Sequence, residues 1–235
     1  MAKETFQARV VSNLLTTAKI FETTLELVDP PEFGFKAGQF VTVPVADKVL
    51  RSYSIASTPA DTKRLLLIVD ITPDGPGSRF FAQLREGDAV AFQGPYGAFC
   101  VKEDTDQELI LVATGTGIAP IRGMILDLYE RGQHDRPMTL FYGCRHRPDL
   151  IFHEEIEKWA AEHPRLVYHP TLSQPENGGW QGMKGRVTAH LPHYVDQVAG
   201  KSAFLCGSKG MLKDVREILQ GKGMDRKKIK QEQFF

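Results

Sequence analysis

The feature that most constrains the fold is an uninterrupted apolar run, residues 109–113 (LILVA), followed at once by the string GTGIAP at residues 115–120. A strand without polar alternation is typical of a parallel sheet, in which both faces are buried. The glycines let a backbone approach a ligand closely, and the N–H groups at the start of the following helix favour phosphate. We therefore expect a phosphate-binding turn here, with a plain strand-to-helix turn without a ligand as the alternative.

Pro120 makes this turn a variant of the common dinucleotide-binding string, which has glycine or alanine where Pro120 stands. Proline nevertheless suits the first turn of a helix, because the N–H group that it lacks has no helical partner there. The string is thus compatible with a helix that starts directly after the glycines.

Strands and helices alternate after residue 103, which favours a parallel sheet with helices on its faces. The expected strands are residues 109–113, 139–142, 165–169 and 203–206, and the expected helices are residues 118–131, 150–161 and 209–220. The polar, acidic stretch 102–106 marks the expected boundary. We expect an α/β domain over residues 103–235.

The first hundred residues have the pattern of an antiparallel β domain. Runs rich in Val, Leu, Ile, Phe and Thr are separated by turn clusters, as in a barrel or a sandwich; they are residues 5–12, 21–28, 39–45 and 64–71. One short helix is expected at residues 78–84 with Ser78 as its N-cap. Residues 94–99 (GPYGAF) are expected to form a rigid turn that closes the domain. The sequence therefore predicts two domains, 1–102 and 103–235.

Two further strands of the second half end in small residues. Cys206 precedes Gly207 at the end of one strand, and Arg145 follows the end of another. Ligands of open α/β sheets bind at the carboxyl ends of the strands, near the point where the strand order reverses. A cysteine such as Cys206 is most often a buried small side chain, but its place before Gly207 favours a functional role. The Arg145 guanidinium is suited to phosphate or ribose.

Residues 51–57 (RSYSIAS) are the most distinctive string of the first half. It joins a cation, a planar aromatic side chain and three hydroxyl groups, and on an extended strand Arg51, Tyr53 and Ile55 would share one face. Such a strand suits a flavin, whose ring stacks on aromatics and whose pyrophosphate needs positive charge; an ordinary amphipathic strand is the alternative. Gly77 and Ser78 open the short helix and are a second candidate seat for pyrophosphate.

Cysteine content and charge balance disfavour several other classes of protein. Cys100, Cys144 and Cys206 are too scattered for a disulfide framework, a zinc cluster or an iron–sulfur cluster, and they predict a reducing compartment, the cytoplasm. The 29 basic residues equal the 29 acidic ones, which disfavours a nucleic-acid binder. The polar start of the chain and the lack of any apolar run near about 18 residues predict neither a signal peptide nor a membrane span.

The distinctive strings follow one another in a recognisable order: RSYSIAS, PGS before a short helix, GPYGAF, GTGIAP, FYGCR, CGSKGM and a terminal QEQFF. In this order and spacing, essentially the whole chain resembles the ferredoxin–NAD(P)⁺ reductase family, and within it the bacterial reductase modules that serve oxygenases or ferredoxins. The resemblance implies an antiparallel β-barrel that binds FAD and an α/β domain that binds NAD(P). It also implies hydride transfer between NAD(P)H and FAD, with single electrons exchanged with a separate redox protein.

For the flavin, the resemblance implies three contacts on the RSYSIAS strand. Arg51 would contact the FAD phosphate, Tyr53 would stack on the isoalloxazine, and Ser54 would hydrogen-bond near its reactive N5. The other implied FAD-binding residues are Ser52, Gly77 and Ser78.

For the nicotinamide, the resemblance implies that Cys206 lies beside the ring and that Glu232 tunes the charge there. Ser54, Cys206 and Glu232 are thus the expected catalytic residues. An aromatic residue at the C-terminus, Phe234 or Phe235, would cover the flavin until nicotinamide displaces it. The other implied NAD(P)-binding residues are Thr116, Gly117, Pro120, Arg145, Ser173 and Gly207.

Gln174 favours NADH over NADPH as the coenzyme. NADP-preferring members of the family usually have an arginine directly after the serine that corresponds to Ser173, whereas the neutral amide of Gln174 offers no charge to a 2′-phosphate. Residues 180–187 (WQGMKGRV) also resemble the NAD-using members. Arg145 still offers one cation, so NADPH stays open.

Two groups of polar side chains have competing interpretations. No carboxylate or thiolate stands at metal-ligand spacing from His190 and His193, so a surface loop is expected there and not a metal site. The basic residues near the C-terminus form either a solvated helix end or a docking patch for an acidic ferredoxin; they are Lys222, Arg226, Lys227, Lys228 and Lys230.

Two alternative functions also stay open. One is an NAD(P)H:flavin reductase, which releases its flavin as a product. The other is a non-catalytic docking or regulatory subunit built on the same fold.

Overall fold

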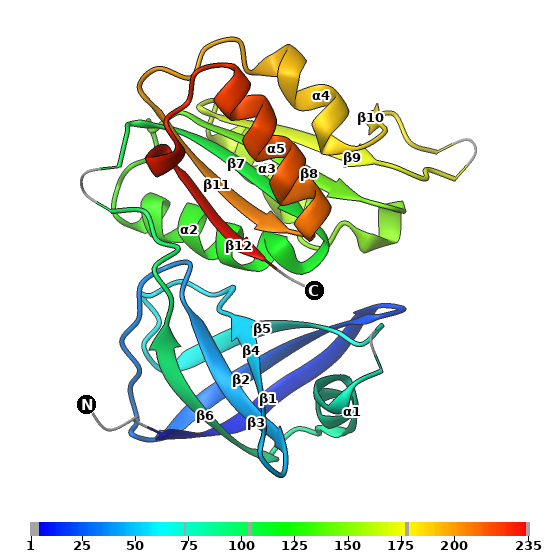
Figure 1. Ribbon diagram of the computed structural model, residues 1–235. Coiled ribbons are helices and arrows are strands. Elements are labelled where there is room, and N and C mark those ends of the chain that lie inside the picture. The colour runs from blue at the N-terminus through cyan, green and yellow to red at the C-terminus, as the bar shows by residue number, and fades with distance from the viewer. Residues whose placement is uncertain (1–4, 73, 103–104, 177–178, 234–235) are drawn as a thin grey trace. The chain divides into compact units, whose positions relative to one another are not determined.

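The computed structural model describes residues 5–72, 74–102, 105–176 and 179–233. The chain forms two compact units (Figure 1). Unit 1 consists of residues 1–101 with residues 122–131, and unit 2 consists of residues 102–121 with residues 132–235.

Unit 1 is one antiparallel sheet that closes into a barrel (Figure 1). Its elements are β1 (Thr5–Thr17), β2 (Ile20–Asp29), β3 (Phe40–Ala46), β4 (Val49–Ser54), β5 (Arg64–Asp70), α1 (Pro76–Gln83) and β6 (Ala89–Tyr96). The strand order is β4-β3-β6-β1-β2-β5. A bridge between Ile55 and Leu67, and a 2.8 Å hydrogen bond from the Ala56 N–H to the Leu66 carbonyl, join the two edges. The predicted antiparallel barrel is confirmed.

Alternate side chains of the strands fill the barrel. On β1, Phe6, Ala8 and Val10 are buried and the residues between them are exposed, as the two-residue period of a strand requires. Phe6 packs against Phe33 and Phe92 with ring centroids 4.8 and 5.3 Å apart. Phe81 of α1 is fully buried in the same core. The short helix therefore rests on a packed scaffold.

Unit 2 contains a parallel sheet with the strand order β10-β9-β8-β7-β11-β12. Its elements are β7 (Glu108–Thr114), β8 (Met138–Cys144), α3 (His153–Glu162), β9 (Leu166–Leu172), β10 (Met183–Lys184), α4 (Val187–Tyr194), β11 (Lys201–Gly207), α5 (Lys209–Gly221) and β12 (Ile229–Gln233). The helix α2 (Ile118–Glu130) begins in unit 2, and its residues from 122 onward belong to unit 1. The order runs outward from β7 to β10 and then returns to β11 on the other side of β7. The carboxyl ends of β7 and β11 therefore flank the switch point of the sheet. The predicted α/β parallel sheet is confirmed.

Helices cover both faces of the parallel sheet. Tyr168 and His169 are neighbours on β9 and therefore point to opposite faces. The Tyr168 hydroxyl is 3.2 Å from Nδ1 of His153 on α3, whereas the His169 ring lies 4.3 Å from that of Tyr194 on α4. Burial from both sides explains the apolar run at residues 109–113, in which each residue is at most 1% exposed.

Two helices begin elsewhere than the sequence predicts. α1 begins at Pro76 with Gly75 as its N-cap, so the prediction that Ser78 caps this helix is wrong. Proline is pre-organised for the first helical position, and this starts the helix two residues earlier. α3 begins at His153 and not at residue 150, because Phe152 has a left-handed φ of 59° that interrupts the helical backbone.

The turn predicted at residues 94–99 is wrong for residues 94–96, and residues 97–99 belong to no helix, strand or turn. Residues 94–96 continue β6, and Tyr96 pairs with Phe40 of β3. The glycine and proline of this string indicate a turn on their own, but the neighbouring strand supplies partners that extend the ladder. The rest of β6 was not predicted from the sequence either.

His190 and His193 lie in α4, so the predicted surface loop is wrong. The buried residues Val187, Leu191 and Val195 recur every four positions, which is the spacing of a helix face. β12 was likewise missed as a strand. It is an edge strand whose only buried residue is Ile229, so it lacks an apolar pattern.

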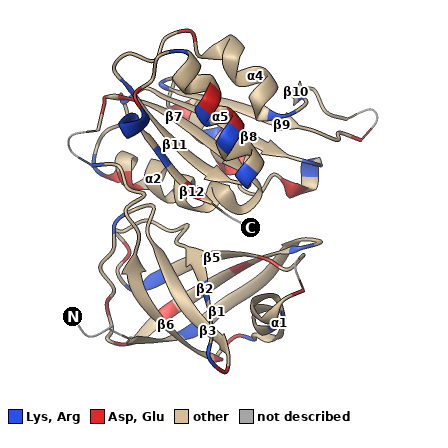
Figure 2. Ribbon diagram, in the orientation of Figure 1, with Lys and Arg blue, Asp and Glu red and all other residues tan. Residues whose placement is uncertain are grey.

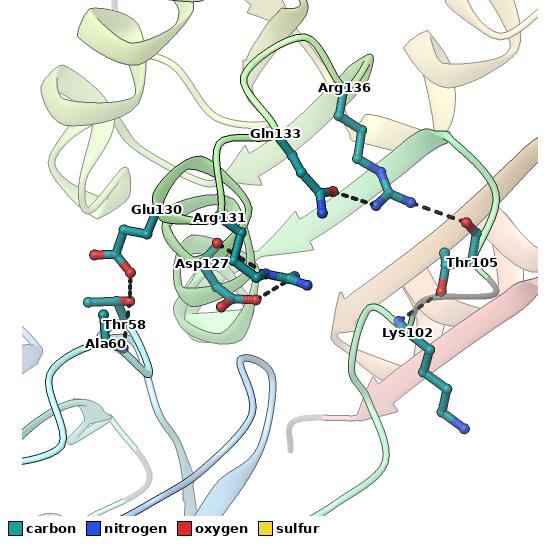
Figure 3. A network of polar contacts seen from close by, with 9 residues as sticks. All are labelled: Thr58, Ala60, Lys102, Thr105, Asp127, Glu130, Arg131, Gln133 and Arg136. Carbon is teal, nitrogen blue, oxygen red and sulfur yellow. Dashed lines mark hydrogen bonds and ion pairs between the residues drawn. The ribbon is translucent and has the colours of Figure 1, made fainter.

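The Arg136 guanidinium fastens the chain that enters the parallel sheet (Figure 3). It donates to the carbonyl oxygens of Gln107 at 3.0 Å and Thr105 at 3.3 Å, and to the Gln133 side chain at 3.0 Å. The Thr105 hydroxyl in turn accepts the Lys102 N–H at 2.9 Å. These contacts, all within unit 2, fix the start of β7.

Residues 122–131 of unit 1 hold the chain that follows β4. Arg122 Nη1 donates to the Ala56 carbonyl at 2.7 Å, and the Thr58 hydroxyl donates to the Glu130 carboxylate (Figure 3). A β-carbon at Gly123 would lie 3.0 Å from the Ser57 carbonyl oxygen, so glycine permits a close approach here. Contacts with residues 122–131 therefore fix the position of the chain at the end of the RSYSIAS string and just after it.

Candidate functional site

The turns after β7 and β11 are packed against each other. A β-carbon at Gly117 would lie 2.2 Å from the Cys206 carbonyl oxygen, and one at Gly207 would lie 2.1 Å from Thr114 Oγ1. Thr114 Oγ1 also accepts a 3.3 Å hydrogen bond from the Ser208 N–H. Only a hydrogen atom fits at either α-carbon without a shift of the neighbouring atoms. The structure therefore brings two of the predicted turns together at the switch point.

Two helices begin at these turns. α2 follows a short 3₁₀ helix, Gly115–Gly117, in which Gly115 has a left-handed φ of 55°. α5 is capped by Ser208, whose Oγ accepts the Met211 N–H at 3.4 Å. The first N–H groups of each helix lack helical partners and carry the positive end of the helix dipole. Thr116 is half-buried, Pro120 is buried, and both lie at this helix start.

Cys206 and Glu232 face each other across the parallel strands β11 and β12. The Cys206 side chain is fully buried, and this burial, followed by the charge of Glu232, raises the pKa of its thiol well above the ordinary value. The thiol is therefore protonated at neutral pH and is not a nucleophile. The pair provides an uncharged S–H group and a half-buried carboxylate next to Gly207.

The ends of β8 and β9 bring Arg145 and Ser173 close together. The Ser173 N–H donates to the Cys144 carbonyl and the Gln174 N–H donates to the Arg145 carbonyl, both at 2.9 Å. Arg145, Ser173 and Gln174 are all exposed. These three residues therefore offer a guanidinium, a hydroxyl and a neutral amide to a ligand.

In unit 1, Arg51 and Tyr53 of β4 meet the N-terminus of α1 at Gly77. A β-carbon at Gly77 would lie 2.4 Å from the Tyr53 hydroxyl oxygen and 3.3 Å from Arg51 Cγ. The Tyr53 ring packs edge-on against Phe81 at 4.7 Å. Burial raises the pKa of the Tyr53 hydroxyl to about 12, against the opposing charge of Arg51. A neutral phenol, an exposed cation and a helix N-terminus are thus gathered in one place.

The alternation predicted for the RSYSIAS string ends after Tyr53. Arg51 and Tyr53 share a face, as both approach Gly77. Ser54, Ile55 and Ala56 are all buried, because β4 ends at Ser54 and the next two residues join the edges of the barrel.

The predicted serines occupy different environments. Ser52 is exposed, whereas Ser54 and Ser78 are 4% and 7% exposed. The Ser78 hydroxyl points to the Asp70 carbonyl at 3.5 Å, so this residue presents its backbone N–H at the helix start. Phe234 and Phe235, which were expected to cover the flavin, lie outside the described residues.

Three residues that support the candidate sites were not predicted: two contact the glycine turns of unit 2, and one contacts α1. Thr114 joins the ends of β7 and β11, and the Tyr142 hydroxyl donates to the Gly115 carbonyl at 3.2 Å. Thr114 directly precedes the GTGIAP motif and Tyr142 belongs to the FYGCR motif, so their places in the sequence could have indicated them. Asn13 donates to two carbonyls at the C-terminal end of α1, those of Phe81 at 2.8 Å and Leu84 at 3.0 Å. No local pattern signals Asn13, because its partners are 68 and 71 residues away.

The basic residues near the C-terminus are only partly a helix end. Lys222 donates to the Pro192 carbonyl at 3.0 Å, and Lys228 pairs with the Asp106 carboxylate at 2.9 Å. The other three are exposed. Arg226 and Lys227 lie in the short 3₁₀ helix that precedes β12, and Lys230 lies in β12 itself. Figure 2 shows the basic residues of this segment in blue.

Within the described ranges, no group of three or more His, Cys, Asp and Glu residues is arranged to hold a metal ion. No helix in the same ranges is both long and apolar enough to cross a membrane.

Comparison with known proteins assigns both units. The family model of the oxidoreductase FAD-binding domain matches residues 8–100, and that of the oxidoreductase NAD-binding domain matches residues 111–217. Ferredoxin–NADP reductase B of Sorangium cellulosum is 34% identical in an alignment of 243 positions that covers 98% of each chain. The chain belongs to the ferredoxin–NADP reductase family. As a member of this family it is a flavin-dependent oxidoreductase with an FAD-binding and an NAD-binding domain.

Other members of the family are longer than this chain. The reductase component of phenol 2-monooxygenase from Pseudomonas sp. strain CF600 is 38% identical over 92% of this chain, which spans only 62% of that protein. The crystal structure of the Amycolatopsis cytochrome P450 reductase GcoB matches 99% of this chain and 70% of its own, with a TM-score of 0.90 and 28% identity. The shared part is therefore the two-domain reductase module.

The residues of both units fit the two dinucleotides of this family. Gly77 is a position where a β-carbon would displace Tyr53, and the exposed Arg51 stands beside it. This set offers a cation, backbone N–H groups and an aromatic ring, which are the groups that a flavin dinucleotide needs. In unit 2, the paired glycine turns supply the phosphate-binding backbone for a nicotinamide dinucleotide.

Proposed function

We propose that the chain transfers a hydride between NAD(P)H and FAD and exchanges single electrons with a separate redox protein. The observation that carries this proposal is the meeting of the glycine turns of β7 and β11 next to Cys206, in the unit that matches the NAD-binding family model. The relatives named as a ferredoxin–NADP reductase and as an oxygenase reductase component support it.

The two cofactors are assigned to separate domains. Residues 1–102 form the FAD-binding domain, because Arg51, Tyr53 and Gly77 gather there. Residues 103–235 form the NAD(P)-binding domain, because both glycine turns belong to its sheet. FAD held by Arg51, Tyr53 and Gly77 would supply the chemistry that joins two-electron hydride transfer to one-electron transfer.

In the first domain, Arg51 neutralises phosphate charge and the Tyr53 ring packs against the isoalloxazine. The N–H groups of Gly77 and Ser78, at the open start of α1, donate to the pyrophosphate. Ser54 hydrogen-bonds to the flavin near its N5. Ser52, exposed on the same strand, completes the set.

In the second domain, the turn at Thr116 and Gly117 binds the coenzyme pyrophosphate through its N–H groups. Cys206 borders the nicotinamide with an uncharged thiol, and Glu232 sets the charge on the far side of that thiol. Buried, preorganised groups of this kind position reactants and exclude water. The other binding residues are Pro120, Arg145, Ser173, Gly207 and the C-terminal Phe235.

NADH is the proposed coenzyme. The neutral Gln174 stands directly after Ser173, where NADP-preferring members of the family usually have an arginine that balances a 2′-phosphate. Arg145 provides a guanidinium at the end of β8. Catalytic efficiency with NADPH equal to that with NADH would overturn this preference.

The proposed partner is a ferredoxin or an oxygenase component, and the proposed compartment is the cytoplasm. Among the described residues, Cys100, Cys144 and Cys206 form no disulfide, which suits a reducing compartment. The exposed Arg226, Lys227 and Lys230 are candidates for contact with an acidic partner.

The test of this function is the absorption spectrum of the protein purified without added flavin. We expect a yellow protein that releases one FAD per chain on denaturation and reduces a one-electron dye with NADH. A chain that binds FAD only weakly and releases reduced flavin would be a flavin reductase instead. Absence of any NAD(P)H-driven dye reduction by FAD-loaded protein would support a non-catalytic subunit.

A further inference from the structure

Tyr142 is a fully buried residue of β8 whose hydroxyl reaches the glycine turn after β7. Its Oη donates to the Gly115 carbonyl at 3.2 Å and lies 3.4 Å from the Asp149 carbonyl. The Asp149 carbonyl also accepts a hydrogen bond from the Cys144 thiol, with a sulfur–oxygen distance of 3.1 Å. Burial raises the pKa of the Tyr142 hydroxyl well above its usual value, so the phenol keeps the proton that it donates.

The Gly115 carbonyl and the Thr116 N–H belong to one peptide group. A trans peptide is planar, so its C=O and N–H point in opposite directions. The Ile118 N–H also donates to the Gly115 carbonyl, and both donors approach it from within unit 2. When the carbonyl is held inward by Tyr142, the Thr116 N–H must point away from Tyr142.

The space beside the α-carbon of Gly115 is open. Gly115 is exposed, and no described atom lies within 4 Å of the position that a β-carbon on it would take. Its φ of 55° belongs to the left-handed region, which glycine adopts without strain. Glycine on its own also reaches many other conformations, so the turn needs an additional contact to hold this one.

We propose that Tyr142 is the positioning residue for the coenzyme turn: its hydroxyl holds the Gly115 carbonyl inward and thereby directs the Thr116 N–H to the coenzyme pyrophosphate. The inference rests on the proposed function, since it assumes that this turn binds NAD(P)H. Tyr142 touches neither the nicotinamide nor the flavin in this role. Its loss should therefore weaken the binding of phosphate-bearing ligands without changing the intrinsic reactivity of the flavin.

The test uses the FAD-loaded variant Tyr142→Phe, which removes only the hydroxyl. ADP-ribose carries the pyrophosphate but no redox-active ring, so calorimetry measures its binding separately from activity. Loss of one hydrogen bond should weaken ADP-ribose binding by about three- to tenfold and raise KM for NADH similarly. Reduction of FAD by 1-benzyl-1,4-dihydronicotinamide, a hydride donor without phosphates, should keep the wild-type rate.

Tyr168→Phe is the matched control. It removes a hydroxyl from the neighbouring strand that contacts His153 and not the turn, so ADP-ribose binding should be unchanged. Equal weakening by both variants, or unchanged binding in Tyr142→Phe, would overturn the role of Tyr142. If wild-type protein fails to bind ADP-ribose, the proposed function itself falls.

Gly115→Ala keeps the inference testable if Tyr142→Phe does not fold. A β-carbon at this position meets no described neighbour, so the substitution disturbs only the left-handed backbone. It should reproduce the weaker ADP-ribose binding and the unchanged rate with the phosphate-free donor. ADP-ribose binding as tight as in the wild type would contradict control of the coenzyme by this peptide.

Discussion

The Tyr53 hydroxyl lies against the backbone of Gly77, so close that a β-carbon on Gly77 would stand 2.4 Å from it. β4 and the N-terminus of α1 meet at this point. The absence of a side chain at Gly77 is what allows the aromatic ring, the Arg51 side chain and the helix N–H groups to share one small region. This contact is the core of the proposed flavin site.

Gly77→Ala should therefore release FAD. The added β-carbon forces the Tyr53 ring away from α1, and we expect FAD binding to weaken by about tenfold or more, since such overpacking costs about 1–3 kcal/mol. Gly75→Ala is the matched control, because no described atom lies within 4 Å of its β-carbon position. Fluorescence titration of the apoprotein with FAD measures both. Equal affinities would mean that Tyr53 and Gly77 do not form the site.

Asn13 should matter for the stability of unit 1 although it lies outside the proposed FAD site. Its amide donates to two carbonyls at the C-terminal end of α1, and its oxygen accepts the hydroxyl of the buried Thr23 at 2.7 Å. Asn13→Ala leaves these groups unpaired and should lower the free energy of unfolding by about 1–3 kcal/mol. Asn13→Asp should lower the free energy of unfolding further than Asn13→Ala, because a carboxylate near the negative end of the helix dipole is repelled. Urea denaturation with Leu14→Ala, an exposed neighbour, as control measures this.

The fold was largely predictable from the sequence because its signals are local. The run at residues 109–113 and the string after it define a doubly covered strand and a helix start. α4 was missed although Val187 and Leu191 are spaced as on a helix face, because the neighbouring histidines and Pro192 indicate a loop. β12 exposes most of its side chains, so its place in the sheet depends on backbone pairing with β11, which leaves no apolar pattern.

The sequence motifs of the candidate site were predictable, but the residues that hold those motifs in place were not. Glycines at Gly77, Gly117 and Gly207 mark close approaches, and the structure supplies the reason at each. Asn13 and Tyr142 act through contacts with residues distant in sequence, which no single string encodes. The assignment of Ser78 as a helix cap failed because Pro76 starts the helix earlier.

Gly117→Ala should damage the coenzyme site directly. Its β-carbon would overlap the Cys206 carbonyl, a backbone atom that cannot rotate away. We expect the stability of unit 2 to fall by about 1–3 kcal/mol and NADH binding to be lost. Gly210→Ala, in the first turn of α5 with no described atom within 4 Å, should be neutral or slightly stabilising. Thermal unfolding and coenzyme titration compare the two variants.

Cys206→Ala should slow the reduction of the flavin by NADH more than it weakens coenzyme binding. The thiol is buried at the end of β11 and uncharged, so its role is to shape the space beside the nicotinamide. Stopped-flow rates at saturating NADH separate the two effects. A reduction rate equal to that of the wild type would remove Cys206 from the site.

Cys206 should also add to the alkaline loss of stability. Its thiol pKa is raised in the folded protein, so above the unfolded value of about 8.5 the folded state holds a proton that the unfolded state has lost. The Cys206 thiol therefore makes its full contribution to the free energy of unfolding below about pH 8.5, and this contribution decreases as the pH rises above that value. Between about pH 9 and 10, wild-type protein should lose stability faster than Cys206→Ser in urea denaturation. Parallel pH profiles would contradict the raised pKa.

The most direct test of the proposed function is an anaerobic titration of the FAD-loaded protein with NADH, followed through the visible flavin absorption band. We predict that one equivalent of NADH bleaches the band. Two equivalents of an oxidised ferredoxin should then restore it, because a hydride carries two electrons and the carrier takes one at a time. A flavin band that stays oxidised with NADH and with NADPH would contradict the proposed hydride transfer.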